Sequence, residues 1–309
     1  MDASPTPEQE ELRAQARAFL EATPEPTWGA LAELGWTGVG VAEELGGAGL
    51  GFLEQAVLHE ELGRALTPGP FYSTVAVSLP ALPADDQAAV AAGEASWALA
   101  LGPLVPDLDS VTNVAVAGGD GVYELVRFER ELLATHDATR PLGVVVGGEA
   151  GRRLCSTEVL PEIRRRSLTA LALEACGVGA RALELAVSYV GEREQFGRPI
   201  GSYQAVAHPL ATTFMELELA RSLALGAAWA ISVGDGRAGL LAAAAKAQAG
   251  EAAVAACERS IQAHGGIGFT WEHPLQRLIK RALWIRSWEA STSALRAEIA
   301  TRLIDEGGW

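Results

Sequence analysis

The stretch QAHGGIGFTWEH, residues 262–273, interrupts two segments of helical character with a pair of adjacent glycines. A tight turn needs only one glycine. Gly265 and Gly266 together leave several residues of main chain without a side chain, which indicates that another group approaches this backbone closely. A turn closed by a glycine helix cap is the structural alternative.

Two further stretches concentrate polar and charged residues. GEREQFGRPIGSYQAV, residues 191–206, lies between two helical segments, and RALWIRSWEASTSALRAEIA, residues 281–300, follows the glycine loop. His264 and His273 are nine residues apart across a turn, and no cysteine or carboxylate cluster accompanies them. We therefore expect structural polar groups and no metal site. Glu272 is expected to begin the next helix, where its charge favours the helix N-terminus.

The charge balance limits the kinds of partner. The chain has 309 residues, 24 basic and 39 acidic, and a net charge of −15. A protein this acidic repels nucleic acid and anionic membranes at long range, so an anionic ligand would need a local basic cluster. Such clusters are Arg164–Arg166, Arg193 with Arg198, and Arg277 with Lys280 and Arg281. A solvated helix face is the alternative for each, and we favour it for the arginine triplet.

The remaining composition is that of a globular protein. Apolar residues make up 49% of the chain, and the length suggests about two domains. Cys155, Cys176 and Cys257 are odd in number and widely spaced, which argues against a disulfide framework or a zinc site. Cys176 and Cys257 lie in alanine-rich helical patterns, which are typical of small core residues. We expect neither a signal peptide nor a membrane span, and hence a cytoplasmic protein.

The pattern of residue types changes twice along the chain. Residues 1–80 predict helices, with a threonine cap before the first one and helical spacing again from Phe52 to Leu66. Residues 81–155 contain short valine-rich runs, which predict strands, and Gly118–Gly121 predicts a hairpin turn. We expect a small sheet or partial barrel there. Residues 156–309 return to long, alanine-rich helices that can pack closely as a bundle.

Three stretches in this order resemble the acyl-CoA dehydrogenase family. They are EELGGAGLGFLEQAVLHEELGRAL near the N-terminus, REQFGRPIGSYQAVAH, and QAHGGIGFTWEHPLQRLIKRA. The resemblance covers both helical regions well and the middle region poorly. It implies a mainly α fold with a small β domain: an N-terminal helical domain, a reduced middle β domain and a C-terminal four-helix bundle.

The resemblance also implies FAD, bound at a subunit interface. Arg193 matches the arginine that contacts the FAD pyrophosphate, a task that suits the charge and donor geometry of a guanidinium. Phe196, Gln204 and the turn residue Gln195 match positions near the adenosine half. The loop that packs on the FAD diphosphate and adenosine is matched by Gln262, Gly265 and Gly266, where bare backbone N–H groups can approach a phosphate.

The same resemblance assigns the catalytic base to Glu289. Counted without gaps, this glutamate lies 27 residues after Gln262, at the position of the family's base, and it follows an aromatic residue, Trp288. Its carboxylate would remove the α-proton of an acyl-CoA while a hydride leaves the β-carbon for flavin N5. The glutamate's own backbone N–H and a flavin ribityl hydroxyl would polarise the thioester carbonyl. A surface glutamate without chemistry is the alternative.

Two departures qualify the resemblance. The family usually has Gly-Thr after the glutamate, whereas this chain has Ala290 and Ser291; alanine requires a negative φ there, and Ser291 can supply a hydroxyl at the flavin. The loops that hold the flavin ring are not found between residues 81 and 155. The chain therefore resembles both a homo-oligomeric dehydrogenase and one subunit of a heteromer with a longer family member.

Some heteromeric members act on steroid or other bulky CoA thioesters. A non-catalytic, partner-dependent subunit and a flavin oxidase remain alternatives. An electron-accepting flavoprotein would be a further partner of a dehydrogenase.

Overall fold

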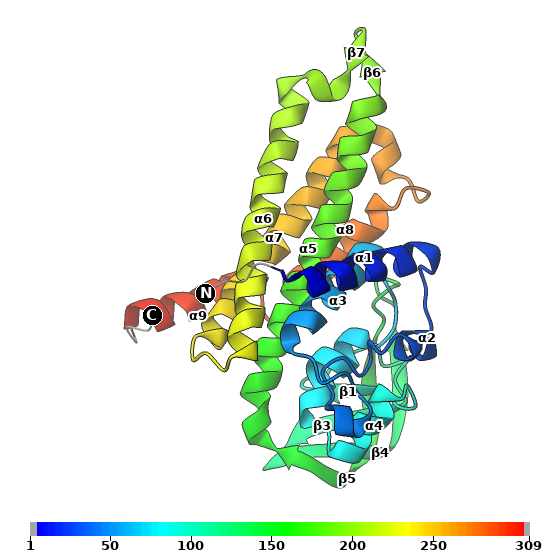
Figure 1. Cartoon of the computed structure of the whole chain (residues 1–309), viewed down its shortest axis with the longest axis vertical. Helices are drawn as coiled ribbons and strands as arrows, with labels where there is room; N and C mark the ends of the chain where they lie inside the picture. Colours follow the sequence, from blue (N-terminus) through cyan, green and yellow to red (C-terminus); the bar gives the residue numbers. More distant parts are fainter. Residues whose placement is uncertain (1–4, 306–309) are drawn as a thin grey trace.

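The computed structural model describes residues 5–305 and has three parts: helices, a small sheet, then a long bundle. In Figure 1 the bundle runs vertically, α1 and α3 cross its waist, and the sheet lies at its lower end. The helices are α1 (Pro7–Ala22), α2 (Trp28–Glu33), α3 (Phe52–Ala65), α4 (Ala84–Ala91), α5 (Leu160–Glu192), α6 (Gln204–Ser232), α7 (Ala238–His264), α8 (Leu275–Ser287) and α9 (Thr292–Ala300). The strands are β1 (Trp97–Ala100), β2 (Val105–Pro106), β3 (Asn113–Gly118), β4 (Gly121–Leu133), β5 (Leu142–Ser156), β6 (Glu194–Gln195) and β7 (Arg198–Pro199). Shorter helical turns are η1 (Glu43–Leu45), η2 (Tyr72–Ser78), η3 (Leu79–Ala81), η4 (Thr157–Val159), η5 (Ile200–Ser202), η6 (Gly265–Phe269) and η7 (Thr301–Asp305).

Helix α1 begins where the sequence predicts it. The Thr6 side chain accepts a hydrogen bond from the backbone N–H of Gln9, and the Gln9 side chain accepts one from the backbone N–H of Thr6, which completes a capping box. The helix packs on α3 through ion pairs as well as apolar side chains. Arg13 and Arg17 donate to Glu60 and Glu61 of α3, and both glutamates are buried. These contacts hold α1 against α3, which packs on the middle of the bundle.

Helices α5 to α8 form the predicted C-terminal bundle. Helix α5 has 33 residues and extends for about 50 Å, and it packs against α3, α6, α7 and α8. Alanine fills most of the buried positions of α7, which allows the neighbouring backbones to lie close together. Cys176 in α5 and Cys257 in α7 are small buried core residues, as predicted. Among the described residues, no helix is both long enough and apolar enough to cross a bilayer.

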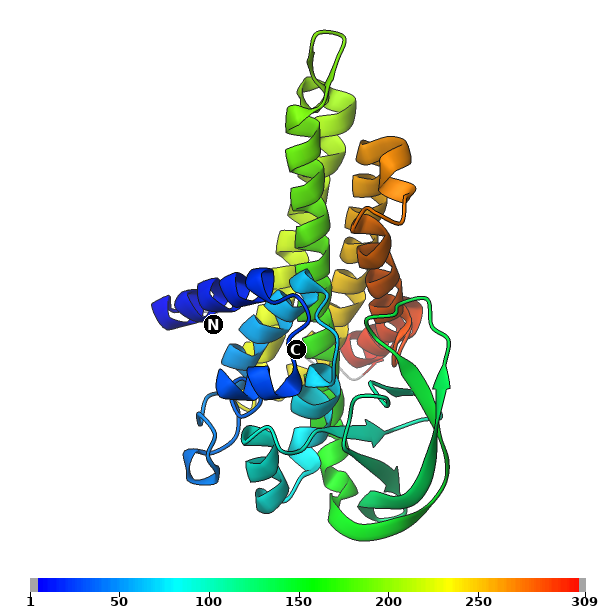
Figure 2. The ribbon, with the colours of Figure 1, turned by 90° about the vertical axis from the view of Figure 1, so that its right-hand side faces the viewer.

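The middle region is a single five-stranded sheet of order β1-β3-β4-β5-β2. Gly118 pairs with Gly121, so β3 and β4 are joined by the predicted glycine turn. The edge strands β1 and β2 touch, and the long β4–β5 ribbon curves around the end of the molecule (Figure 2). Residues 81–155, expected to form a small sheet, also contain helix α4 at Ala84–Ala91, where alanines and first-turn aspartates favour a helix.

A buried ionic network ties the β4–β5 loop to the bundle. Arg281 of α8 is fully buried and donates to Asp137 and Glu174. Arg140 donates to the same Glu174 carboxylate at 2.6 Å. A solvated face is therefore the wrong interpretation for Arg281. Within the arginine triplet it is wrong for Arg166, which lies over the Phe52 ring at 4.8 Å and whose guanidinium pKa is lowered by burial to about 10. Buried charges of this kind stabilise a fold only as complete sets.

Helix α5 approaches α3 closely at Gly177, and this close approach offers a test of the fold. A Cβ added to Gly177 would lie 1.9 Å from the Glu60 carbonyl oxygen, whereas one added to Gly191 on the same helix would meet nothing within 4 Å. We expect Gly177→Ala to lower the free energy of unfolding by about 1–3 kcal/mol, because backbone atoms must separate.

The matched control is Gly191→Ala, which should stabilise α5 by up to about 1 kcal/mol through helix propensity. Urea denaturation of both variants measures the difference. Equal stability of the two variants would contradict the close approach at Gly177.

Candidate active site

The turn between α8 and α9 places Glu289 in an unusual backbone conformation. Helix α8 ends at Ser287, and Ser291 caps α9 by accepting a hydrogen bond from the Ala294 N–H. Between them Glu289 has a φ of 59°, the left-handed region that side-chain-bearing residues seldom adopt. Such a conformation costs about 1–3 kcal/mol and persists only where its surroundings impose it. Ala290 has no positive φ, so the condition set by the missing glycine is met.

The Glu289 carboxylate is held by two hydroxyl groups from distant segments. Tyr72 of η2 donates from its hydroxyl to Oε1 at 2.9 Å. Ser167, in the second turn of α5, donates to the same oxygen. The two hydroxyl oxygens are themselves 2.6 Å apart. The structure therefore brings a carboxylate from the C-terminal region against the N-terminal helices and the beginning of the bundle.

The electrostatic environment raises the pKa of Glu289. Removal of the carboxylate from water is the main cause, and the hydrogen bonds from Ser167 and Tyr72 act in the opposite direction, as do the charges of Lys246 and Arg164. The turn itself lies at the surface, so Glu289 as a whole residue retains solvent exposure. Its carboxylate end is nevertheless crowded by η2 and α5. A carboxylate whose pKa is raised toward neutrality is suited to proton transfer.

Glu289 lies at the edge of a cavity of about 600 Å³. The cavity is formed between η2, the β1–β2 segment, the beginning of α5 and the α8–α9 turn. Its lining is mostly apolar; the side chains other than Glu289 include Val77, Leu99, Leu101, Leu104, Leu160 and Trp288. No described group accepts a hydrogen bond from the backbone N–H of Glu289. This part of the molecule thus combines a base, a free N–H donor and an apolar space.

The first group of predicted cofactor residues lies at the far end of α5. Arg193, Gln195 and Phe196 form the exposed β6–β7 tip, which projects beyond the bundle in Figure 1. Phe196 is 93% exposed and has a φ of 55°. Ser167, which contacts Glu289, precedes Arg193 by 26 residues along α5, or about 39 Å at ~1.5 Å per residue. The structure therefore does not bring Arg193 and Glu289 into one site.

The second group lies at the same end of the bundle. Gln262, Gly265 and Gly266 are exposed, and Gln204 is exposed at the beginning of α6. Gly265 has a φ of 64°, and a Cβ added to Gly265 or Gly266 would meet no atom of this chain within 4 Å. Packing within the chain thus gives no reason for a glycine at position 266. The space beside this glycine is open to a group that does not belong to this chain.

The two histidines of this segment pack against each other. His264 is buried, its Nδ1 lies 2.7 Å from the Ser260 carbonyl oxygen, and its ring stacks on Tyr189. His273 contacts the His264 ring. Glu272 does not begin α8, because the helix starts three residues later at Leu275. No group of three metal-ligating side chains is found between residues 5 and 305.

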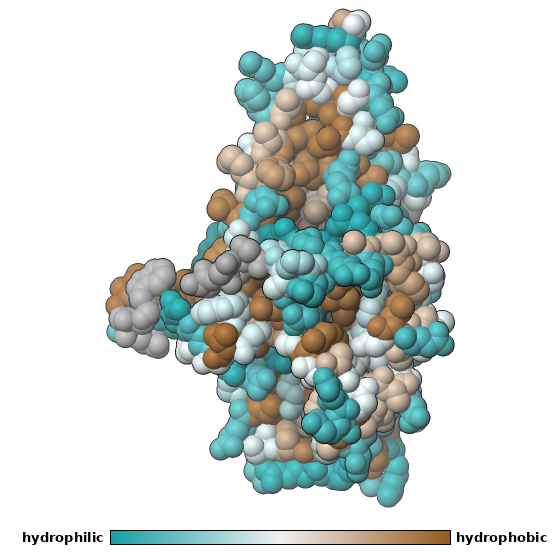
Figure 3. All heavy atoms as spheres, viewed as in Figure 1, coloured by the Kyte–Doolittle hydropathy of each residue, from teal (hydrophilic) through white to brown (hydrophobic). Residues whose placement is uncertain are grey.

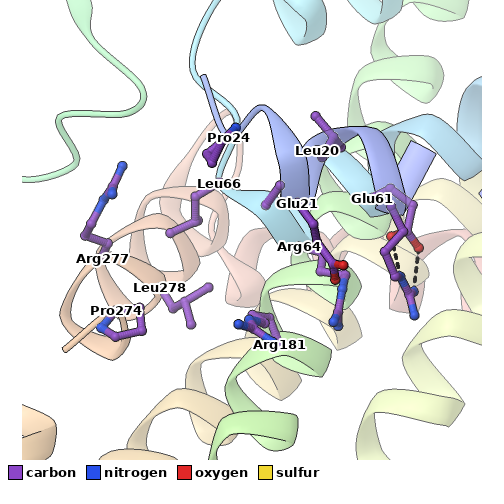
Figure 4. A pocket seen from close by; sticks show the side chains of 12 residues that line it. Leu20, Glu21, Pro24, Glu61, Arg64, Leu66, Arg181, Pro274, Arg277 and Leu278 are labelled. Carbon is purple, nitrogen blue, oxygen red and sulfur yellow. Dashed lines mark hydrogen bonds and ion pairs between the residues drawn. The ribbon is translucent and has the colours of Figure 1, made fainter. Parts of the chain in front are cut away.

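A second cavity, of about 390 Å³, lies between α1, α3, α5 and α8 (Figure 4). It contains four arginines, each of which lies within ion-pair distance of an acidic side chain. Arg17 makes two hydrogen bonds to Glu61, and Arg64 and Arg181 both pair with Glu184. The arginines of this cavity are held in ion pairs, whereas the Glu289 carboxylate forms no ion pair among the described residues, so the Glu289 cavity is the better candidate for chemistry.

Tyr72 and Ser167 escape prediction from the sequence. Tyr72 lies in a run of small and apolar residues, and Ser167 is one polar residue on a helix with an apolar face. Their partner, Glu289, is 217 and 122 residues away, respectively. No local signal marks contacts of this kind.

Comparison with protein families matches two segments of the chain. Residues 6–84 match the acyl-CoA dehydrogenase N-terminal domain, and residues 166–304 match the acyl-CoA dehydrogenase C-terminal domain. The acyl-CoA dehydrogenase IpdE2 of Mycobacterium tuberculosis is 37% identical over 265 residues, which cover 84% of this chain and 80% of IpdE2. The acyl-CoA dehydrogenase FadE34 of the same organism is 34% identical over 318 residues, covering 92% of this chain but only 44% of FadE34.

Solved structures agree with this assignment. A variant of the steroid ACAD Tcur3481-Tcur3483 superposes with a TM-score of 0.86 at 27% identity, covering 97% of this chain and 98% of the other. The ChsE4-ChsE5 complex from Mycobacterium tuberculosis has a TM-score of 0.87 at 23% identity and covers 98% of this chain and 99% of the other. The chain therefore belongs to the acyl-CoA dehydrogenase family of flavin oxidoreductases.

Proposed function

We propose that the protein catalyses FAD-dependent α,β-dehydrogenation of an acyl-CoA thioester, with Glu289 as the base. The observation that carries the proposal is the placement of Glu289: its desolvated carboxylate faces an apolar cavity and has a raised pKa. A carboxylate in this state can take a weakly acidic proton without being strongly solvated by water.

In the proposed reaction, the Glu289 carboxylate takes the α-proton of the acyl group, and a double bond forms between the α and β carbons. FAD supplies the hydride acceptor, N5 of its isoalloxazine ring, for the hydrogen that leaves the β-carbon. The backbone N–H of Glu289, which has no partner among the described residues, donates to the thioester carbonyl and stabilises the charge that develops there. The hydroxyls of Tyr72 and Ser167 orient the carboxylate.

Basic residues beside the cavity suit the phosphates of coenzyme A. Leu160 and Arg164 line the Glu289 cavity and also a neighbouring hollow of about 400 Å³. Arg165 and Arg302 line that hollow as well. Arg164 is paired with Glu298, whereas Arg165 has no acidic partner among the described residues. Guanidinium groups bind phosphates with both charge and directed donors.

The chain's own residues fit the adenosine half of FAD better than the flavin ring. Bare glycines and Arg193 at one end of the bundle suit a diphosphate. The length of α5 keeps this end about 39 Å from Ser167 and so from Glu289. FAD bound at the tip would thus serve the base of another subunit. Apolar atoms also gather over the upper part of the bundle in Figure 3, and α6 exposes Phe214, Met215 and Leu219. Exposed apolar surface of this kind supports an oligomer.

The small size of the sheet favours one form of this proposal, in which the chain forms a heteromer with a longer family member. The sheet contains only five strands, and the family segments matched by the chain do not include residues 85–165. A partner with a larger β domain would complete the site for the flavin ring. A cavity lined by apolar side chains suits a large apolar acyl group.

The first prediction concerns the base. Glu289→Gln should lower the rate constant of flavin reduction by acyl-CoA about 10²- to 10⁴-fold, because the amide cannot take the α-proton. Flavin absorbance should remain, since the substitution preserves shape. Stopped-flow absorbance measures both. Glu258→Gln, on the exposed face of α7, is the matched control and should behave as wild type. Undiminished reduction in the Glu289→Gln protein would assign the base to another residue.

The second prediction concerns pH. The Tyr72 hydrogen bond lowers the pKa of Glu289, so Tyr72→Phe should raise that pKa. The base acts when ionised, and the rate of flavin reduction therefore rises with pH through this pKa. In Tyr72→Phe the midpoint should move to higher pH, while the plateau rate stays within about threefold of wild type. A lowered plateau with an unshifted midpoint would show that Tyr72 acts in another way.

The third prediction concerns the cofactor. Arg193→Ala should weaken FAD binding about tenfold or more, because a charged hydrogen bond to phosphate contributes ~1.5–3 kcal/mol. Titration of the apoprotein with FAD gives the dissociation constant. Arg127→Ala, at an exposed position of β4, is the control. Equal FAD affinity of both variants would contradict the role of Arg193.

The colour of the purified protein tests the heteromer. If the chain purified alone is colourless and becomes yellow only with a longer family member, the heteromer is favoured.

A further inference from the structure

A buried lysine stands out in a chain that uses arginine almost throughout. Lys246 and Lys280 are the only lysines among its 24 basic residues. Lys246 lies in the alanine-rich helix α7 and is 1% exposed. Burying an ammonium is costly unless its donors are satisfied, so the contacts of Lys246 indicate why a lysine occupies this position.

All three N–H donors of Lys246 are directed at main-chain carbonyls of one short segment. Nζ lies 3.0 Å from the carbonyl oxygen of Arg286 and 2.9 Å from that of Trp288, and it also donates to the carbonyl of Ala290. Arg286 and Trp288 are at the C-terminal end of α8, where helix carbonyls lack partners within the helix. A positive charge at this end is favourable.

Helix α7 is shaped to bring the lysine to this segment. Gly250 lies one turn beyond Lys246, and a Cβ added there would be 3.2 Å from the Arg286 Cα. The glycine thus lets the end of α8 approach α7. An arginine at Lys246 would be longer and planar, whereas a compact ammonium reaches three carbonyls converging on one point.

Two of the three carbonyls flank Glu289. Holding the carbonyls of Trp288 and Ala290 with one atom fixes the orientation of the main chain on both sides of the residue whose φ is 59°. We propose that Lys246 is a positioning residue, which holds the α8–α9 turn in its left-handed conformation and so directs the Glu289 carboxylate to Tyr72, Ser167 and the cavity. The inference rests on the proposed function, because it concerns how the base of that reaction is placed.

Lys246 acts on Glu289 and not on a ligand. Its hydrogen-bond partners among the described residues are all main-chain carbonyls, and it is not part of the cavity lining. The groups that face the Glu289 carboxylate are Tyr72 of η2, Ser167 and Arg164 of α5, and Lys246 of α7. Loss of the lysine charge would therefore raise the pKa of Glu289 in addition to freeing the turn.

The test is Lys246→Met in the FAD-containing protein. We expect the plateau rate constant of flavin reduction by acyl-CoA to fall about 100-fold, because the base is displaced, and the pH midpoint to move upward. Raising the pH should not restore the plateau, in contrast to Tyr72→Phe. Burial lowers the pKa of Lys246 to about 8, so the pH series stays below that value. Lys280→Met, which removes the other lysine charge from the outer part of α8, should leave both quantities unchanged.

Hydrogen exchange provides a readout that does not depend on turnover. In Lys246→Met the amides of residues 286–288, which are hydrogen-bonded in the last turn of α8, should exchange at least about tenfold faster, while those of α5 and α6 keep their protection. Unchanged exchange in this segment together with a wild-type rate of reduction would overturn the inference. If Lys246→Met does not fold, Lys246→Gln replaces it. Its neutral amide keeps two donors, so a smaller change in the same direction is expected, and wild-type behaviour would equally overturn the inference.

A double-mutant cycle separates this inference from the proposed function. In a Glu289→Gln background, Lys246→Met should lower the residual rate by a smaller factor than it lowers the wild-type rate, since only its effect on the Glu289 backbone N–H remains. A loss of the same size in both backgrounds would show that Lys246 does not act through the Glu289 carboxylate. If instead Glu289→Gln alone is fully active, the proposed base fails, and the exchange measurement still decides whether Lys246 holds the turn.

Discussion

The length of one rigid helix constrains the rest of the structure. Helix α5 carries Ser167, a partner of Glu289, near its beginning and leads into the β6–β7 tip at its end. Its 33 residues form a continuous core with α3, α6, α7 and α8. A helix packed on four sides does not bend enough to bring its ends together. The base and the candidate diphosphate-binding loops therefore lie at different ends of a single chain, and in the function proposed above association of subunits would bring them together.

A desolvated carboxylate is useful only if its surroundings hold it, and here three segments do so. Tyr72 of η2 and Ser167 of α5 donate hydrogen bonds to the Glu289 carboxylate. Lys246 of α7 donates to a main-chain carbonyl of the turn that carries Glu289. Behind Tyr72, the Arg140 guanidinium lies 5.0 Å from the ring centroid and pairs with Glu174 of α5. The polar network thus continues from the β4–β5 loop into the bundle.

Local features of the fold could be predicted from the sequence, whereas features that depend on distant contacts could not. The cap at Thr6, the hairpin at Gly118–Gly121 and the long alanine-rich helices depend on neighbouring residues, and the structure contains them. The sequence left open whether Arg281 binds an anion or lies on a solvated face, and it could not indicate the buried ion pairs, because Asp137 and Glu174 lie more than a hundred positions away in the sequence. Similarly, the family resemblance pointed to Glu289 through its distance from the glycine loop, but nothing in the sequence pointed to its hydroxyl partners Tyr72 and Ser167.

The left-handed conformation at Glu289 connects these observations. A glutamate gains nothing locally from a φ of 59°, and glycine or asparagine would adopt it at lower cost. The side chain is therefore required at this position for a reason outside the turn, and the turn is stabilised by groups outside it. A purely structural carboxylate would be satisfied by an arginine, as Glu174 and Glu298 are. Glu289 instead accepts from two neutral hydroxyls and faces an apolar space, so its charge is neither neutralised by a salt bridge nor fully solvated. That combination leaves a basic oxygen available to a substrate, which a structural role would not require.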